Sequence, residues 1–455
     1  MMSARDLATM VALLTTAGGL LLGLRFVQQK FRLAPEVARK LFHIGGGALG
    51  LTLPWLFDDF LPVLILGFVV GGLFLAIRML PVLREGVGQV FLAVQRQSIG
   101  EFGFLASFCL LFWLSHGDKL LYTIPIMMVA LADALAALVG QTYGKFQLRM
   151  TGDRKSIEGA ITFFLIAFFC VHIPVLLWGE TGRLESLLIA LNVGAMVMLA
   201  EAAAWWGLDN FIIPIWGYIL LKSLLLAGSV ELVGDFTFLV SLAAFMYYWR
   251  SRATLGDDAL AGAVLWGFVV WSVGGLPWTI APLLQFATYA TLTVRTPLDQ
   301  VRNLPFPVVL ANIAASIPWL LAFRQTGDIE LFIPFAACFG ANLAIIALTR
   351  VKFAYPQMSM RNAVATGVST GMIIVVPSML AVYRLHVMTL IGAAATLVAI
   401  SIAAVLFYLI QPRLTEMPID SGRWLRQALV TAACSLIAFS VELGLLWTLH
   451  QNLAR

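Results

Sequence analysis

Charged residues are scarce in this sequence. Asp, Glu, Lys and Arg make up 12% of the 455 residues, whereas 61% are hydrophobic. A typical soluble domain is about 25% charged and roughly half apolar, so this composition excludes a soluble globule. Apolar runs of about 17 to 25 residues, each long enough to cross a hydrocarbon core of roughly 30 Å as a helix, follow one another along the chain. The sequence therefore predicts an all-α, polytopic transmembrane helical bundle, an integral multi-pass membrane protein.

Cysteine is also scarce. The four cysteines fall inside apolar runs, far apart and without the paired spacing of a metal-binding knuckle or a disulfide framework: Cys109, Cys170, Cys338 and Cys434. We therefore expect them to be packing residues. The first apolar run lacks a basic flank and a small-residue cleavage site, so no cleavable signal peptide is expected.

The apolar runs predict about 14 to 16 membrane spans. Their approximate limits are 7–24, 43–57, 60–77, 102–115, 120–140, 157–177, 184–204, 211–228, 235–249, 259–275, 278–293, 305–323, 329–349, 362–383, 387–410 and 427–449. With the N-terminus outside, 22 Lys and Arg residues lie in inner loops and 6 lie outside, as the positive-inside rule requires. The same rule accounts for the net charge of +5, so no nucleic-acid partner is expected.

In this orientation, polar helix starts gather on the cytoplasmic face. They read RKLFH (39–43), RQSIGE (96–101), GDRKSIEG (152–159) and GLDN (207–210). Helix N-termini expose unpaired N–H groups and a partial positive charge, which attract phosphate groups. Ordinary inner-face anchors would account for the Lys and Arg residues, but poorly for the acidic ones. From these starts and the loop before residue 157 we expect nucleotide-binding residues: Arg39, Lys40, His43, Ser98, Glu101, Lys145 and Ser156. A lone interfacial histidine is as often an anchor, so His43 has two open interpretations.

Acidic residues lie at the inner ends of two spans. Asp133 is about two turns below the inner end of its span, Glu201 has a similar depth, and Asp209 follows in the next loop. A carboxylate within a span costs roughly 2.5 to 3.5 kcal/mol on insertion scales unless something compensates. Mg²⁺ takes one or two carboxylates and leaves its other positions for water and phosphate. If the helices meet, Asp133 and Glu201 are metal ligands.

Other roles for Asp133 are an ion pair with a buried cation such as Lys222 and a proton relay in a transporter. The neighbouring loop favours a phosphate site, because it combines glycines with four cations: Lys145, Arg149, Arg154 and Lys155. The stretch GQTYGKF within it is not a Walker A sequence, since it is one residue short and lacks the hydroxyl after the lysine. The stretch GGGALG (45–50) predicts close helix packing through Gly46 and Gly50.

Five ordered motifs run through residues 30–225: RKLFH, RQSIGE, ADALAALVGQTYGK, DRKSIEG and EAAAWWGLDNFIIP. Together they resemble the phytol kinase and dolichol kinase family of membrane-embedded isoprenoid-alcohol kinases. The resemblance implies phosphoryl transfer, typically from CTP, to the hydroxyl group of a long isoprenoid alcohol. It also implies a nucleotide and Mg²⁺ site made of Asp133, Gly140, Gly144, Lys155, Glu158, Gly159, Glu201, Asp209 and Asn210.

Phosphoryl transfer mainly requires positioning and charge neutralisation. We therefore expect Asp133, Lys155 and Glu201 to be catalytic, with Mg²⁺ on the two carboxylates and Lys155 on the phosphates. Either carboxylate could accept the hydroxyl proton. The expected function is a CTP-dependent, phytol-like alcohol kinase. A cytidylyltransferase acting on a lipid phosphate and a carrier or flippase for phosphorylated isoprenoids are the alternatives.

The second half is poorer in motifs, so we expect two domains, 1–250 and 251–455. Segments of residues 259–450, among them QVRNLPFPVVLANIAAS and RNAVATGVSTGMIIVVPSMLAV, resemble more weakly the membrane family that includes phytyl phosphate kinases. That family would carry an acidic stretch where this chain reads FGANLAIIALTR (339–350). We therefore expect a degenerate partner domain.

Overall fold

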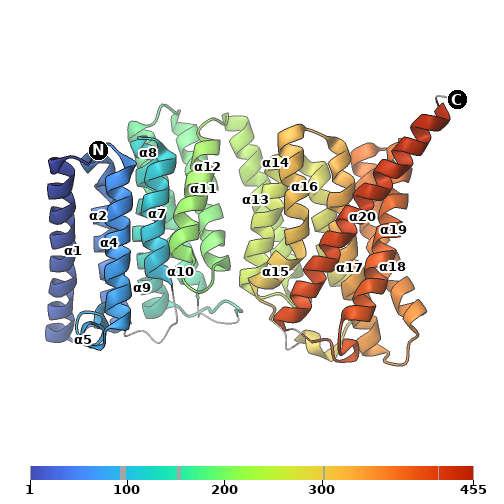
Figure 1. The fold of residues 1–455 in the computed structure, drawn as a ribbon, viewed down its shortest axis with the longest axis horizontal. Coiled ribbons are helices and arrows are strands. Elements are labelled where there is room, and N and C mark those ends of the chain that lie inside the picture. Colours follow the sequence, from blue (N-terminus) through green and yellow to red (C-terminus); the bar gives the residue numbers. More distant parts are fainter. Residues whose placement is uncertain (1, 93–98, 151–154, 301–302, 419, 454–455) are drawn as a thin grey trace. The chain divides into compact units, whose positions relative to one another are not determined.

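The computed structural model of the chain is built from helices (Figure 1). It describes residues 2–92, 99–150, 155–300, 303–418 and 420–453. Over these ranges there is no β-strand beyond two isolated bridges, Gln147–Ser156 and Leu255–Leu304. The predicted all-α fold is confirmed.

The chain forms two compact units, Met1–Phe238 and Leu239–Arg455. The division falls within α13 (Ser229–Trp249), ahead of the domain boundary expected near residue 250. The activities expected of the two domains stay predictions.

The first unit contains the helices before α13. They are α1 (Ala4–Phe31), α2 (Pro35–Leu51), α3 (Leu53–Leu56), α4 (Phe60–Met79), α5 (Pro81–Glu85), α6 (Gln89–Leu92), α7 (Gly100–Ser115), α8 (Lys119–Met127), the π-helix η1 (Met128–Ala132), α9 (Asp133–Tyr143), α10 (Ile157–Trp178), α11 (Arg183–Ala203) and α12 (Asp209–Leu224).

The second unit contains the helices after α13, with short 3₁₀ turns between them. They are η2 (Arg250–Arg252), α14 (Asp257–Thr291), η3 (Pro297–Gln300), α15 (Phe306–Ile313), η4 (Ala314–Ser316), α16 (Ile317–Thr326), η5 (Ile329–Leu331), α17 (Phe332–Ala354), α18 (Met360–Tyr383), α19 (Val387–Ile410), η6 (Leu414–Glu416) and α20 (Ser421–Leu453).

Twelve helical segments of the described chain are long and apolar enough to cross a membrane, and α7 is a shorter apolar helix. The expected spans 259–275 and 278–293 both lie in α14, which is broken at Gly275 with φ 67°. Glycine adopts this left-handed conformation without strain. Beyond the end of α14, Arg295 donates a hydrogen bond at 2.7 Å to the carbonyl of Arg252, which precedes its start. The two halves of α14 therefore fold back on each other at Gly275, and each half corresponds to one of the two expected spans.

The core of the second unit surrounds α17. In the segment Ile329–Ala354, which contains α17, 94% of the most apolar 18-residue stretch is buried. Trp278 of α14 stacks on Phe323 and packs against Phe335 of α17. Cys338, in α17, and Cys434, in this core, are buried free thiols. They are packing residues, as expected.

Close contact between α2 and η1 organises the first unit. A Cβ atom on Gly47 would lie 2.3 Å from the Cβ atom of Ala130, and one on Gly50 would lie 2.6 Å from the ring of Phe108. A Cβ atom on Gly46 would make only an ordinary contact, 3.6 Å from Phe104. The expected close packing therefore holds for Gly50, but Gly47 takes the place of Gly46, because successive residues point about 100° apart around a helix.

Replacing Gly47 by leucine should lower the free energy of unfolding by about 1 to 3 kcal/mol, because the side chain has no room between α2 and η1. Gly72→Leu is the matched control, since a Cβ atom there meets no atom within 4 Å. Thermal unfolding in detergent measures both variants. Equal melting temperatures would contradict the close contact.

Candidate functional site

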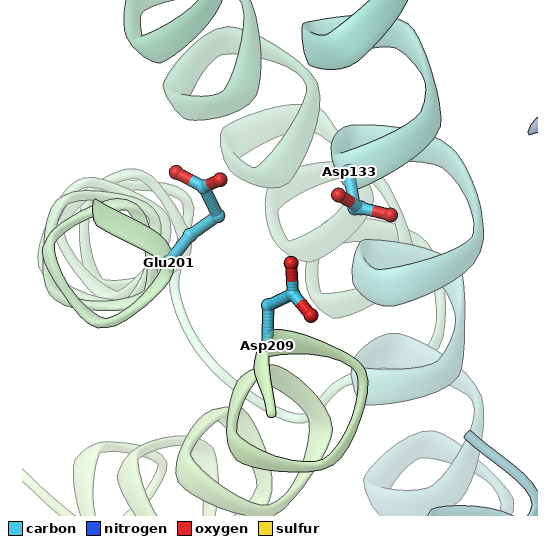
Figure 2. A group of neighbouring side chains, drawn as sticks. All are labelled: Asp133, Glu201 and Asp209. Carbon is cyan, nitrogen blue, oxygen red and sulfur yellow. The ribbon is translucent and has the colours of Figure 1, made fainter. Parts of the chain in front are cut away.

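Three acidic side chains from three helices meet at one end of the first unit. They are Asp133 at the start of α9, Glu201 in the last turn of α11 and Asp209 at the start of α12. One oxygen from each lies within 4.8 Å of the other two, and Figure 2 shows the three carboxylates around a common space. The structure therefore brings together Asp133 and Glu201, the two predicted metal ligands, and adds Asp209 beside them.

An irregular stretch of helix positions Asp133. Pro125 lies inside α8, where it removes a backbone donor, and the five-residue π-helix η1 follows and ends at Ala132. Single π-turns are frequent at functional sites, because the extra residue changes the direction of the side chains that follow. Ala132 and Ala134 are buried without exposed area on either side of the carboxylate. Asp133 itself is only 5% exposed.

Two lysines pair with two of the three carboxylates of the acidic cluster. Lys40 Nζ of α2 lies 2.6 Å from Asp133 Oδ2, and Lys155 Nζ lies 2.8 Å from Glu201 Oε1. Lys222, the alternative partner considered for Asp133, donates instead to the hydroxyl of Tyr218 at 3.2 Å. The pairing of Asp133 with Lys222 is therefore wrong. The cation that pairs with this carboxylate is Lys40, 93 residues earlier in the chain.

Lys155 lies in the loop just before α10. Burial disfavours its charged form, but the negative charges of Glu201 and Asp209 outweigh that effect and raise the pKa of Lys155 above its ordinary value. Lys155 therefore stays a cation at neutral pH.

The acidic cluster opens into a cavity of about 640 Å³. Among the predicted residues, its walls include Arg39, Lys40, Asp133, Gly140, Gly144, Lys155, Ser156, Gly159, Glu201 and Asp209. Glu36 also lines it, although the sequence analysis did not select this residue. Its position three residues before Arg39, with which it forms a hydrogen bond at 2.9 Å, was the available signal.

The described residues at the two ends of the loop between α9 and α10 pack tightly against these helices. A Cβ atom on Gly144 would lie 2.2 Å from the carbonyl oxygen of Gly140, so only glycine fits there. Ser156 caps α10 by accepting a hydrogen bond from the Gly159 N–H at 3.2 Å. The Glu158 carboxylate accepts hydrogen bonds from the Lys145 N–H at 3.0 Å and from the next N–H. Lys145 and Glu158 thus lie outside the walls of the cavity, where Glu158 holds the loop.

The remaining predicted residues line a smaller cavity of about 80 Å³, which shares Arg39 with the larger one. His43, Glu101 and Asn210 are in its walls, together with Arg78. Arg78 Nη2 lies 3.6 Å from Glu101 Oε2. Arg78 was not among the predicted site residues, because in the sequence it is one of the many cations expected on the inner face. Ser98 lies outside the described residues, as does Arg154.

His43 is buried and is not an exposed anchor. Its Nε2 atom lies 3.0 Å from the carbonyl oxygen of Val129 and 3.6 Å from Asp133 Oδ2. Its ring stacks on Phe104 with centroids 4.0 Å apart. His43 therefore lies at the wall between the two cavities.

The donors of the acidic cluster suit a hard divalent cation. Carboxylate oxygens are the ligands that Mg²⁺ prefers, and a magnesium ion at a phosphate site keeps positions for water and phosphate oxygens. Ammonium and guanidinium groups, supplied by Lys40, Lys155 and Arg39, suit phosphate oxygens. The arrangement can therefore hold a polyphosphate and a metal ion together.

Comparison with known proteins identifies a relative. No family model matches the chain, and no solved structure matches it. The chain is 33% identical over 184 residues to the phytol kinase of Synechocystis sp., and the match covers 40% of this chain and 76% of that protein. This identity extends over most of the relative's length, so the chain belongs to the phytol kinase family.

Proposed function

We propose that this protein transfers the terminal phosphoryl group of CTP to the hydroxyl group of a long-chain isoprenoid alcohol such as phytol. Membership of the phytol kinase family supports a phosphotransferase with an alcohol acceptor. The observation that carries the proposal is the meeting of three carboxylates and two lysines at one cavity. The positive-inside rule assigns this end of the helices to the cytoplasmic face, where nucleotides are available.

Asp133, Glu201 and Asp209 would hold Mg²⁺. When bound, Mg²⁺ would neutralise charge on the phosphates of the nucleotide. In the structure, lysines neutralise two of these carboxylates. The third carboxylate, Asp209, leaves the ligand set with one negative charge that these two lysines do not compensate, which favours a cation.

An incoming triphosphate offers Lys40 and Lys155 new anionic partners. Both lysines line the cavity, where their ammonium groups would exchange a carboxylate oxygen for a phosphate oxygen. That exchange frees carboxylate oxygens of Asp133 and Glu201 for the metal ion. Nucleotide and metal binding are therefore coupled through the two lysines.

In the transfer step, the alcohol oxygen forms a bond to the γ-phosphorus, and the bond between that phosphorus and the β–γ bridging oxygen breaks. CDP leaves, and the hydroxyl proton passes to Asp133 or Glu201. Lys40, Lys155 and Arg39 stabilise the charge on the phosphoryl oxygens. The products are an isoprenyl monophosphate and CDP.

The purified protein in lipid nanodiscs, given Mg²⁺, γ-labelled CTP and phytol, should place the label in the lipid. With phytyl phosphate in place of phytol, label in pyrophosphate would instead indicate a cytidylyltransferase. No turnover, together with flux of phosphorylated isoprenoid in proteoliposomes, would indicate a carrier.

Neutralising the acidic cluster should abolish transfer. Asp133→Asn, Glu201→Gln and Asp209→Asn should each lower the rate by at least about a hundredfold, because each removes a charged ligand from the phosphate site. Glu180→Gln, at an exposed position after α10, is the control. Thermal stabilisation by Mg²⁺ of the protein bound to a nonhydrolysable CTP analogue is the second measurement, and it should weaken only in the cluster variants. Unchanged transfer and stabilisation would reject the metal assignment.

Two lysines of one loop should behave differently. Lys155→Met should raise the KM for the nucleotide by about 10- to 100-fold, the value of a charge-assisted hydrogen bond. Lys145→Met should leave the KM near that of the wild type, because Lys145 is exposed and outside the walls of the cavity. Steady-state kinetics with varied CTP measure both. An equal rise in the KM for CTP in both variants would contradict the assignment of Lys155, and not Lys145, to the phosphate site.

A further inference from the structure

An apolar cavity of about 200 Å³ lies between α1, α2, α4 and α7 of the first unit. The described residues in its walls include no charged side chain, and leucine and phenylalanine predominate among them. The most polar side chain in its walls is that of Cys109, whose thiol donates to the carbonyl of Val63 at 3.8 Å. Such a cavity accepts hydrocarbon and excludes polar ligands.

The cavity is long. On α4 its walls extend from Val63 to Ile77, a separation that corresponds to about 21 Å at 1.5 Å per helical residue. Small residues on the opposite helices leave this space open, among them Gly18 of α1 and Gly46 of α2. Its shape suits an extended chain.

The apolar cavity adjoins the polar site. Phe42, Phe74 and Phe104 line both this cavity and the small cavity that holds His43 and Glu101. The small cavity in turn shares Arg39 with the cavity of the acidic cluster. Apolar space, small cavity and phosphate site thus follow one another in the first unit.

A carboxylate oxygen at the junction has no hydrogen-bond partner among the described residues. Within that part of the chain Glu101 Oε2 is buried and accepts no hydrogen bond, and the guanidinium of Arg78, its ion-pair partner, is 3.6 Å away. A buried acceptor of this kind is costly unless a donor reaches it. An alcohol hydroxyl group is a donor of the right size.

We propose that the apolar cavity between α1, α2, α4 and α7 binds the isoprenoid chain of the acceptor alcohol, and that its hydroxyl group donates a hydrogen bond to Glu101 beside His43 when the alcohol binds, before the hydroxyl group turns to the phosphate site for transfer. This inference rests on the proposed function for the chemical class of the ligand. It assigns Glu101 to the acceptor, although the sequence analysis assigned it to the nucleotide. The outer wall of this cavity is formed by α1, in which only 6% of the most apolar 18-residue stretch is buried.

Leucine at two wall positions should block the cavity. A Cβ atom on Gly18 meets no atom within 4 Å, and one on Gly46 meets only Phe104 at 3.6 Å, so both variants should fold. Gly19→Leu is the matched control, because it is the next residue of α1, also meets no atom within 4 Å, and does not line the cavity.

With phytol as acceptor, Gly18→Leu and Gly46→Leu should lower kcat/KM by about tenfold, the effect of leaving roughly two methylene groups unburied. With a five-carbon prenyl alcohol, Gly18→Leu should match the wild type, because so short a chain does not reach the blocked region. Gly19→Leu should match the wild type with both acceptors. Equal kcat/KM for phytol in all three variants would overturn the proposal.

Glu101→Ala should raise the KM for the alcohol by about tenfold, the cost of losing a hydrogen bond to a charged group, and leave the KM for CTP unchanged. A rise in the KM for CTP alone would return Glu101 to the nucleotide and overturn its assignment here.

A binding measurement separates this proposal from the kinase activity. Phytol with a photoreactive diazirine at the end of its chain should label peptides of α1 and α4 in nanodiscs, and Gly18→Leu should suppress that labelling. If the wild type transfers no phosphate but labels in this way, the proposed function fails and the chain site stands. Labelling unaffected by Gly18→Leu would overturn the chain site. So would equal labelling by a diazirine phospholipid that phytol does not displace.

Discussion

The ion pair between Asp133 and Lys40 is the interaction on which the polar end of the first unit depends. A carboxylate within a membrane-spanning segment is costly without a partner, and removing one member of a buried pair typically costs about 3 to 5 kcal/mol. Lys40 is 3% exposed and Asp133 5%, so water contributes little to either charge. The pair also joins α2 to α9 across 93 residues of sequence, and so sets where the acidic cluster lies.

The same arrangement compensates acidic charge and separates the polar cavity from the apolar cavity. Lys155 neutralises Glu201 from the loop before α10, and the tight packing of Gly144 holds that loop against the helix ends. The polar cavity then faces the end of the bundle, whereas the apolar cavity extends along α4. The hydroxyl group of an amphiphilic alcohol could therefore meet the nucleotide while its chain stays in the apolar cavity and the nucleotide stays in the polar cavity.

The second unit is organised differently. Its polar interior includes a neutral network in which Gln427 and Thr431 donate to Asn342 Oδ1, and a buried ion pair that joins Arg350 to Asp299 at 2.8 Å. Among the described residues, the acidic group able to hold a metal ion lies in the first unit. A partner domain without a metal site of its own thus remains the prediction for this unit.

The sequence by itself determined the fold class, the approximate spans and the residue types of the site, because hydrophobic runs and misplaced charges are local signals that need no partner. It also selected Asp133, Glu201 and Lys155. Only the tertiary structure decided that Lys40, rather than Lys222, neutralises Asp133, and that Glu101 and His43 line the smaller neighbouring cavity. Helix rotation and the π-turn before Asp133 set those contacts, and both depend on packing between segments far apart in the chain.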